Sequence, residues 1–357
     1  MIRVLLVDDS PIALHILQRL LARSAGIQVV GTAANGGEAF DLLPALNPDV
    51  ICTDLHMPVM DGLEFTRAVM NKYPRPILVL SISVEPGSSN VFRLLEAGAV
   101  DFYPKPRGII EADHEKLARE LASKIRVLAG VHVFRRAGVA TDDAQLPASP
   151  SLLARAAVRI VAIGASTGGP QALREILSCL PHGFPVPVLC VQHIGEGFLS
   201  EMVAWLGEVS PLPVRVAVQG EVPQAGVAYF APGDTHLELD DGGRFDLTAT
   251  PPCSGHRPSV TVTLRAVARR YGTGAVGVVL TGMGRDGAEG LAEIAAAGGI
   301  TIAQDEASSV VYGMPREAAA LGAAQQVLPL GQIGPALVAL ANKDARLGAT
   351  PRRKAAK

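Results

Sequence analysis

Residues 1–125 alternate short apolar runs with stretches of helical periodicity. The apolar runs typical of buried strands are Ile2–Val7, Ile27–Thr32, Val50–Thr53, Ile77–Leu80 and Val100–Tyr103. After the first run, Ile12, Ile16 and Leu20 lie on one face of a helix, and Pro11 suits its first turn. Strands that alternate with helices favour a parallel sheet with helices on both faces. We therefore predict an α/β fold with a doubly wound, five-stranded sheet in this part of the chain.

A second α/β pattern runs from about residue 156 to residue 342. Val158–Ile163 is an apolar strand that leads into the glycine-rich loop Gly164–Pro170, and a helix with one apolar side follows. Further apolar strands are expected at Val186–Val191 and Val276–Leu280. We predict a second doubly wound α/β domain over residues 156–342.

Two segments lie outside these domains. Between residues 126 and 155 the periodicity weakens, and Thr141–Asp143 and Pro147–Pro150 give this stretch the polar, proline-bearing composition of a linker. The last sixteen residues, from Asn342 on, hold six Lys or Arg and one Asp. We expect residues 343–357 to be a solvated, disordered basic tail rather than a nucleic-acid arm.

The composition narrows the classes of function. The 357 residues carry a net charge of −2, and without the tail the body has a charge of about −7. Such a body argues against nucleic acid as a partner. The four cysteines form no CxxC pair, and we expect them to be free thiols in a reducing compartment. Cys253 and His256 have a metal-like spacing, but two ligands do not make a zinc site.

Membrane insertion is not expected. Residues 318–342 carry no charge, but three glutamines and two prolines would polarise or break a membrane helix there (Gln325, Gln326, Gln332, Pro329 and Pro335). Met1 and Ile2 run directly into a strand pattern that ends in acids, so no leader is expected. We predict a cytoplasmic protein.

Polar groups stand at the ends of successive strands in the N-terminal domain. Asp8 and Asp9 follow the first run, Asp54 the third, Ser81 the fourth and Lys105 the fifth. The carboxyl ends of parallel strands meet at one edge of a sheet, so these groups should converge. Converging carboxylates repel one another unless a hard divalent cation joins them, and oxygen ligands suit Mg²⁺. A lysine and a hydroxyl beside them suit a phosphoryl group. The alternative is that these acids are solvated helix caps.

The loop Gly164–Pro170 is a candidate for a reactive site. Gly164-x-Ser166-x-Gly168 fits a nucleophile elbow between a strand and a helix. The helix N-terminus supplies backbone N–H donors that suit an oxyanion. The same geometry also suits a glycine-rich phosphate cradle, although neither GxGxxG nor GK[ST] is present. The loop alone leaves catalysis and phosphate binding equally open.

A serine nucleophile needs a base, and the base needs a group that orients it. Among the eight histidines His193, which follows the strand Val186–Val191, is the better candidate base, and His256 is second. Asp286 follows the strand Val276–Leu280 in a glycine-dense loop and is the candidate acid, although it could simply cap the next helix. The order Ser–His–Asp argues against the α/β-hydrolase family without weakening the chemistry.

The N-terminal domain resembles the receiver domain of bacterial two-component response regulators over about 120 residues, including Asp54–Pro58 and Asp61-Gly62. The resemblance implies a flavodoxin-like receiver whose phosphoacceptor is Asp54. It also implies that Asp9, Asp54 and the carbonyl of His56 ligate Mg²⁺, with Asp8 acting through water. Lys105 would then bind the phosphoryl oxygens, and Ser81 would move to hydrogen-bond the phosphate.

The segment from about Val158 to Ala341 resembles the methylesterase domain of chemotaxis response-regulator protein-glutamate methylesterases. The motifs that carry this resemblance are Ile163–Gly169, Gln192-His193, Ala231–Asp234, His256–Val260, Leu280–Gly287 and Gln304–Glu306. They imply Ser166 as nucleophile, His193 as base and Asp286 as the orienting acid, with Thr167 and the Met283 backbone near the oxyanion. One departure is Thr261, where this family commonly has Asp.

The two resemblances together imply a phosphorylation-activated serine hydrolase. It would demethylate glutamate methyl esters, and deamidate certain glutamines, on methyl-accepting chemoreceptors during sensory adaptation. A chemotaxis histidine kinase would be the phosphodonor, and the receiver would cover the esterase until Asp54 is phosphorylated. We expect Mg²⁺ to be needed for phosphorylation and no cofactor to be needed for the esterase step. We also expect the protein to be a monomer. The alternatives are a DNA-binding response regulator, for which residues 151–341 show no basic recognition helix, and a non-catalytic phospho-signalling adaptor.

Overall fold

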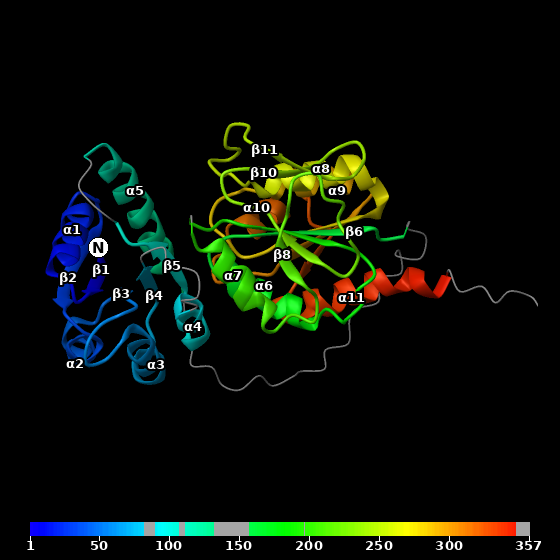
Figure 1. The fold of residues 1–357 in the computed structure, drawn as a ribbon. Coiled ribbons are helices and arrows are strands. Elements are labelled where there is room, and N and C mark those ends of the chain that lie inside the picture. Colours follow the sequence, from blue (N-terminus) through cyan, green and yellow to red (C-terminus); the bar gives the residue numbers. More distant parts are fainter. Residues whose placement is uncertain (82–89, 107–110, 132–156, 196, 348–357) are drawn as a thin grey trace, which may run out of the picture. The chain divides into compact units, whose positions relative to one another are not determined.

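The computed structural model describes residues 1–81, 90–106, 111–131, 157–195 and 197–347. The chain divides into two compact units, each built around its own parallel sheet (Figure 1). The predicted linker lies almost wholly outside the described residues, as does the tail beyond residue 347.

The N-terminal unit contains a five-stranded parallel sheet with the strand order β2-β1-β3-β4-β5. The strands are β1 (Ile2–Val7), β2 (Ile27–Ala33), β3 (Val50–Asp54), β4 (Ile77–Ser81) and β5 (Asp101–Pro104). Helices α1 (Pro11–Ala22) and α5 (Glu111–Leu128) lie on one face, and α2 (Gly36–Leu46), α3 (Gly62–Lys72) and α4 (Asn90–Ala97) lie on the other (Figure 1). The predicted doubly wound, five-stranded sheet is confirmed.

Local sequence signals explain where the first three helices begin. The side chains of Ser10, Asn35 and Asp61 accept hydrogen bonds from backbone N–H groups of the first turns of α1, α2 and α3. Such caps satisfy donors that have no partner inside the helix. β3 and β4 are buried along their whole lengths, as expected for central strands covered on both faces.

The C-terminal unit contains a seven-stranded sheet in which every pair is parallel, with the order β14-β13-β12-β6-β7-β9-β8. The strands are β6 (Ile160–Ala165), β7 (Val188–Gln192), β8 (Val214–Val216), β9 (Ala228–Phe230), β12 (Ala275–Val279), β13 (Ile300–Gln304) and β14 (Gln326–Leu328). A separate antiparallel pair is formed by β10 (His236–Leu239) and β11 (Phe245–Thr248). The second predicted α/β sheet is therefore present.

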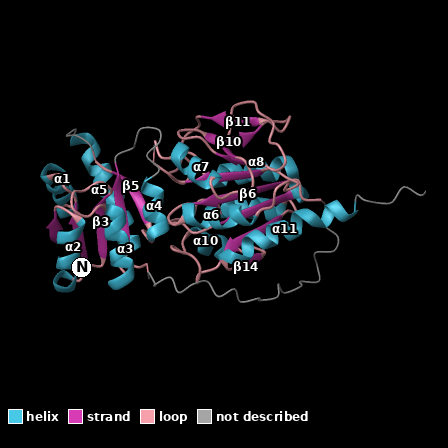
Figure 2. Cartoon of the chain, turned by 60° about the horizontal axis from the view of Figure 1, so that its bottom comes forward, coloured by secondary structure: helices cyan, strands magenta, loops and turns pink. Residues whose placement is uncertain are grey.

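Helices cover both faces of this sheet. They are α6 (Gly169–Cys179), α7 (Leu199–Gly207), α8 (Val260–Tyr271), α9 (Ala288–Ala296), α10 (Met314–Ala320) and α11 (Leu330–Leu347), with a short 3₁₀ turn at Gly272–Gly274. α8 and α9 lie on one face and α6 and α11 on the other (Figure 1). Figure 2 also shows α8 on the opposite side of β6 from α6 and α11.

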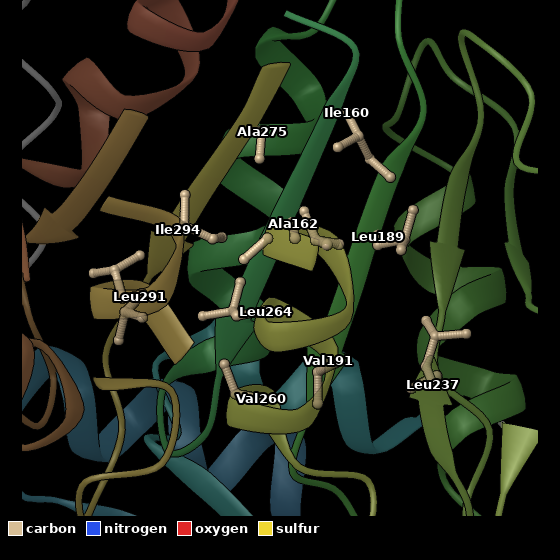
Figure 3. Packing of buried hydrophobic residues seen from close by; sticks show 14 of the residues in the cluster. Ile160, Ala162, Leu189, Val191, Leu237, Val260, Leu264, Ala275, Leu291 and Ile294 are labelled. Atoms are coloured by element: carbon tan, nitrogen blue, oxygen red, sulfur yellow. The ribbon is translucent and has the colours of Figure 1, made fainter. Parts of the chain in front are cut away.

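The core under α8 and α9 consists of aliphatic side chains. Figure 3 shows Val260 and Leu264 of α8 and Leu291 and Ile294 of α9 gathered over Ala162 of β6. All five are at most 1% exposed. Each fully buried aliphatic side chain contributes about 1.5–3 kcal/mol through the hydrophobic effect. This packing fixes the N-terminus of α8 against the middle of the sheet.

The structure corrects two expectations for the C-terminal third. Pro335 does not break a helix but lies inside α11, on an exposed position, while the preceding Gly334 packs against Cys179 of α6. A proline removes one backbone hydrogen bond, and tertiary packing offsets that loss. α11 also continues through Leu347, so residues 343–347 are helical rather than part of a disordered tail. In the described part of the chain no helix is long and apolar enough to cross a membrane.

The inner strands β9 and β13 were not predicted, although both are fully buried. The antiparallel pair β10–β11 and the short edge strands β8 and β14 were not predicted either. These strands are three or four residues long and mostly half-buried, so they lack the apolar runs that mark the central strands. The four cysteines are free, as expected, with Cys52 and Cys190 buried and Cys179 exposed.

Candidate active site

The loops after β6 and β12 meet at the point where the strand order of the C-terminal sheet reverses. From β6 the chain moves to β7 on one side, and it later returns to β12 on the other. In open parallel sheets this switch point is where ligands bind. The backbone N–H of Ser166, directly after β6, donates to the carbonyl of Thr281, two residues after the end of β12, at 3.0 Å. The predicted nucleophile loop and the predicted acid loop are therefore neighbours.

Two buried side chains hold the Ser166 loop in shape. Gln192 Nε2 donates to the Ser166 carbonyl at 2.8 Å, and Thr281 Oγ1 donates to the Thr167 carbonyl at 2.9 Å. Gly168 adopts φ 75°, and a Cβ there would lie 2.6 Å from the side chain of Val310. Because that conformation disfavours any side chain, the glycine of the elbow pattern is required by both backbone and space. The sequence pattern was thus a sound indicator of this turn.

His193 joins the two loops. Its backbone N–H donates to the Ala165 carbonyl at 3.1 Å, and its Nε2 lies 2.8 Å from Asp286 Oδ2. An ionised carboxylate accepts only, so Nε2 carries the proton of the neutral ring. Nδ1 is then the basic nitrogen, and it is buried without a hydrogen-bond partner among the described residues.

Ser166 and His193 are not joined by a hydrogen bond in the described structure. Ser166 is half-buried at the end of β6, next to Gly282, where a Cβ would lie 2.7 Å from Ser166 Cβ. The structure therefore brings His193 and Asp286 into contact and places Ser166 in the adjoining loop. Catalytic hydrogen bonds of this kind are often long before substrate binds.

Asp286 is held by donors on both carboxylate oxygens. The Ser259 hydroxyl (2.8 Å) and the Thr261 N–H (3.0 Å) bind Oδ1, while the Val260 N–H (2.8 Å) and His193 bind Oδ2. Three of these donors come from the start of α8, so the positive end of the helix dipole faces the carboxylate. Burial alone would raise the pKa of Asp286, but the hydrogen bonds from His193, Thr261 and Ser259 outweigh it and hold the pKa well below its usual range.

These hydrogen bonds to Asp286 cannot be predicted from the sequence. Ser259 belongs to the motif His256–Val260, but nothing in the motif indicated that it would bind Asp286. Thr261, the departure from the family pattern, accepts a hydrogen bond from the Gly287 N–H through its hydroxyl at 2.7 Å. A hydroxyl oxygen thus provides an acceptor where the family commonly has a carboxylate.

The residues expected near an oxyanion lie at the same edge. Thr167 is buried, and neither its N–H nor that of Gly168 donates a hydrogen bond to a described residue. Such unpaired donors at a helix start suit a negative oxygen. Met283 follows Gly282, the residue that contacts Ser166, and its side chain is exposed.

The acids of the N-terminal unit converge as predicted. Asp8 and Asp9 follow β1 and Asp54 ends β3, at the reversal of strand order in that sheet. One oxygen from each carboxylate lies within 4.8 Å of the other two, which suits a hard cation with oxygen ligands. The side chain of His56 is exposed, and the predicted ligand at this position is its backbone oxygen.

Lys105 is the cation at this site. Its Nζ lies 2.7 Å from both Asp8 Oδ2 and Asp54 Oδ2. Burial disfavours the charged amine, but the hydrogen bonds to Asp54 and Asp8 outweigh it and raise the pKa of Lys105. For Asp8 burial prevails and raises the pKa of the carboxyl. Ser81 is buried, and its carbonyl accepts from the Lys105 N–H at 2.7 Å, so both predicted switch residues stand at this edge.

Comparison with known proteins covers both units. Residues 161–337 match the family model described as CheB methylesterase, and residues 4–115 match the response regulator receiver domain. A Geobacter metallireducens protein named protein-glutamate methylesterase/protein-glutamine glutaminase 4 is 45% identical, over 96% of this chain and 99% of its own. The chain belongs to the CheB methylesterase family.

Other members of the CheB methylesterase family support the same assignment. A protein-glutamate methylesterase/protein-glutamine glutaminase of Nitrosospira multiformis is 45% identical over 98% of this chain and all of its own. The crystal structure of the Thermotoga maritima CheB methylesterase catalytic domain is 39% identical with a TM-score of 0.50, covering 52% of this chain and 100% of that domain. Both resemblances stated from the sequence motifs are confirmed at the level of the family.

Proposed function

We propose that the chain is a phosphorylation-activated serine hydrolase that demethylates glutamate methyl esters and deamidates specific glutamines on chemoreceptors. The observation that carries the proposal is the buried contact between His193 Nε2 and Asp286 Oδ2 beside the Ser166 loop. The family membership supplies the substrate class, because the relatives are named for these two activities.

The first half of the reaction forms an acyl-enzyme. Ser166 Oγ attacks the ester or amide carbonyl carbon while His193 Nδ1 accepts the hydroxyl proton. The ring then carries a positive charge, which the ionised Asp286 stabilises through Nε2–H. This transfer requires a hydrogen bond between Ser166 Oγ and His193 Nδ1, which we expect to form when substrate fills the site.

The tetrahedral intermediate places a negative charge on the former carbonyl oxygen. The Thr167 N–H and the Met283 backbone are the proposed donors, and removing one such donor typically costs about 3 kcal/mol of transition-state stabilisation. Collapse of the intermediate breaks the bond to the methoxy or amino group. His193 returns the proton, so methanol leaves from an ester and ammonia from a glutamine side chain.

The second half of the reaction restores the enzyme. Water attacks the acyl carbonyl, His193 Nδ1 accepts a proton from it, and the proton then passes to Ser166 Oγ as the acyl bond breaks. The product is a glutamate side chain in both cases. Protein groups alone account for the proton transfers.

In the receiver, Asp54 is the proposed phosphoacceptor for a chemotaxis histidine kinase. Asp8, Asp9, Asp54 and the His56 carbonyl would hold Mg²⁺, which supplies positive charge against the phosphoryl oxygens. Lys105 already contacts Asp54 and is placed to bind a phosphoryl oxygen on it. Ser81, one strand away, is the proposed hydrogen-bond partner of the phosphate.

The test of the proposal is methanol release from chemoreceptors methylated on glutamate, with the full chain in Mg²⁺ and a small phosphodonor. The wild type should release methanol, and Ser166→Ala should release none. Ser178→Ala, an exposed serine of α6, is the matched control and should behave as wild type. Normal release by Ser166→Ala would contradict the assignment of the nucleophile.

Activation by phosphorylation has its own test. Asp54→Asn should leave the basal rate of methanol release intact but remove the increase caused by the phosphodonor. Asp41→Asn, an exposed aspartate of α2, is the control and should keep the increase. An undiminished increase in Asp54→Asn would show that the phosphoacceptor lies elsewhere.

A further inference from the structure

A tight hairpin brings a second histidine to the active site. Cys253 and His256 pair as an antiparallel bridge, with hydrogen bonds from Cys253 N–H to the His256 carbonyl (3.1 Å) and from His256 N–H to the Cys253 carbonyl (3.0 Å). The two residues between them, Ser254 and Gly255, have φ 53° and 82°. Two left-handed residues are the signature of a two-residue hairpin turn, which leaves little freedom at its ends. The position of His256 is therefore fixed by its backbone.

The hairpin is tied to the rest of the unit on its C-terminal side. Arg257 Nη1 donates to the carbonyls of Ala249 (3.2 Å) and Thr250 (3.3 Å). Two residues later Ser259 binds Asp286 through its hydroxyl. One short segment, residues 253–261, thus both anchors the acid of the site and presents the His256 ring.

The rings of His193 and His256 stack face to face. Their centroids are 3.7 Å apart and their planes differ by 8°. Asp286 fixes His193 at one atom, Nε2, and a single hydrogen bond still allows the ring to tilt about that contact. A flat ring in parallel contact blocks this tilt, because tilting would drive one ring into the other. The stack and the hydrogen bond together define the direction in which Nδ1 points.

We infer that His256 is a positioning residue for the reaction proposed above, which acts by holding the plane of the His193 imidazole so that Nδ1 faces the Ser166 hydroxyl. The inference rests on the proposed function and names a residue that the triad itself does not include. His256 exchanges no proton in this role. It works through ring contact alone, so another flat ring should replace it.

Other roles for His256 fit the structure less well. Burial and the neighbouring His193 lower the pKa of His256 to about 4, against a smaller opposing effect of Asp286, so the ring is neutral at physiological pH. A neutral ring adds no positive charge beside the imidazolium that forms on His193. Among the described residues the only candidate metal group of three or more side chains is Asp8, Asp9 and Asp54, so the pair Cys253 and His256 does not gain a third ligand.

The experiment compares His256→Ala with His256→Phe in the full chain, in Mg²⁺ and phosphodonor, with methylated chemoreceptors as substrate. His256→Ala should lower kcat on the order of tenfold or more with little change in KM, because a misdirected base slows proton transfer without weakening binding. His256→Phe keeps a flat ring and should retain kcat within about threefold of wild type. His182→Ala, an exposed histidine elsewhere in the unit, should match wild type.

Folding and function are separated by two further measurements. The fluorescence of Trp205, the one tryptophan of the chain, reports whether each variant keeps a folded C-terminal unit. A folded His256→Phe as slow as His256→Ala, or a His256→Ala with wild-type kcat, would overturn the inference while wild type and Ser166→Ala still behave as proposed. A rise in KM at unchanged kcat would assign His256 to substrate binding instead and also overturn it. A wild type without activity would remove the proposed function and the inference together.

Discussion

The Ser259 hydroxyl donates to Asp286 Oδ1 at 2.8 Å and thereby links the start of α8 to the loop after β12, 27 residues further along the chain. The same hydroxyl oxygen accepts from the Val262 N–H at 3.5 Å as the N-cap of α8. Because Asp286 in turn contacts His193, the orientation of the proposed base depends on where this helix begins. The core in Figure 3 holds α8 in place and so contributes to the geometry of the site.

Ser259→Ala should weaken both links at once. The variant loses the helix cap and one of the hydrogen bonds to a buried carboxylate, at a cost of about 1–2 kcal/mol in the free energy of unfolding. Two backbone N–H groups still hold Asp286, so kcat should fall by less than in variants of Asp286 itself. Urea unfolding followed by Trp205 fluorescence, together with methanol release, measures both effects. Ser178→Ala is the control, and equal stability of the two variants would contradict the prediction.

Asp286→Asn should affect catalysis more than any other single change in the acid loop. An amide cannot stabilise the imidazolium and can hold His193 in the wrong tautomer, so kcat should fall on the order of 10³- to 10⁴-fold. The amide also offers fewer acceptor sites to the donors that surround Asp286. Asp241→Asn, an exposed aspartate, should retain wild-type kcat. A loss of kcat below about tenfold would show that Asp286 does not orient the base.

Thr261→Val should destabilise the acid loop through a buried donor. The Gly287 N–H is buried and donates to Thr261 Oγ1 at 2.7 Å, so the change leaves it unpaired at a cost of about 1–3 kcal/mol. Thr261→Ser keeps the acceptor and should recover most of the stability. The measurement is the midpoint of unfolding, followed by Trp205 fluorescence, which should be lower for Thr261→Val than for Thr261→Ser. Equal midpoints would mean that the hydroxyl is not needed as an acceptor.

The sequence was informative where one physical signal dominates. Apolar runs located all five N-terminal strands and the central strands β6, β7 and β12, with ends that differ by at most two residues. Parallel topology then placed the side chains that follow these strands, Ser166 and His193 among them, at one edge of their sheet. Polar residues that follow a strand can be placed from the sequence because the apolar run shows where the strand ends.

Contacts between segments that are distant in the chain could not be predicted from the sequence. Nothing in the sequence connects Ser259 or Thr261 to Asp286, because these hydrogen bonds depend on how α8 docks on the sheet. By residue type His256 is a second candidate base, whereas the structure stacks its ring on that of His193. Residue type and motif placed it near the site, but ring orientation comes from the hairpin turn at Ser254 and Gly255.

Mg²⁺ binding to the receiver should depend on the converging carboxylates. Titration calorimetry with Mg²⁺ alone should show one site per full chain, and Asp9→Asn should weaken it because one of three oxygen donors loses its charge. Asp41→Asn is the matched control. Asp54→Asn should weaken binding as well, since its carboxylate lies within the same cluster. Unchanged affinity in both cluster variants would place the metal elsewhere.

The stability of the C-terminal unit should depend on pH through His256. The pKa of this ring falls from 6.5 to about 4 on folding, chiefly because of burial and then because of His193. Between these values the unfolded chain binds more protons than the folded one, so stability is undiminished above pH 6.5 and decreases as the pH falls toward 4. The full shift corresponds to a loss of about 3 kcal/mol in the free energy of unfolding.

Urea unfolding followed by Trp205 fluorescence between pH 4 and pH 6.5 measures how the stability of the wild type changes with pH. His256→Phe keeps the stacked ring but cannot be protonated, so its stability should change less between the two pH values. The difference between the two curves isolates His256 from the other groups that titrate there, and parallel curves would mean that His256 does not resist protonation in the folded protein.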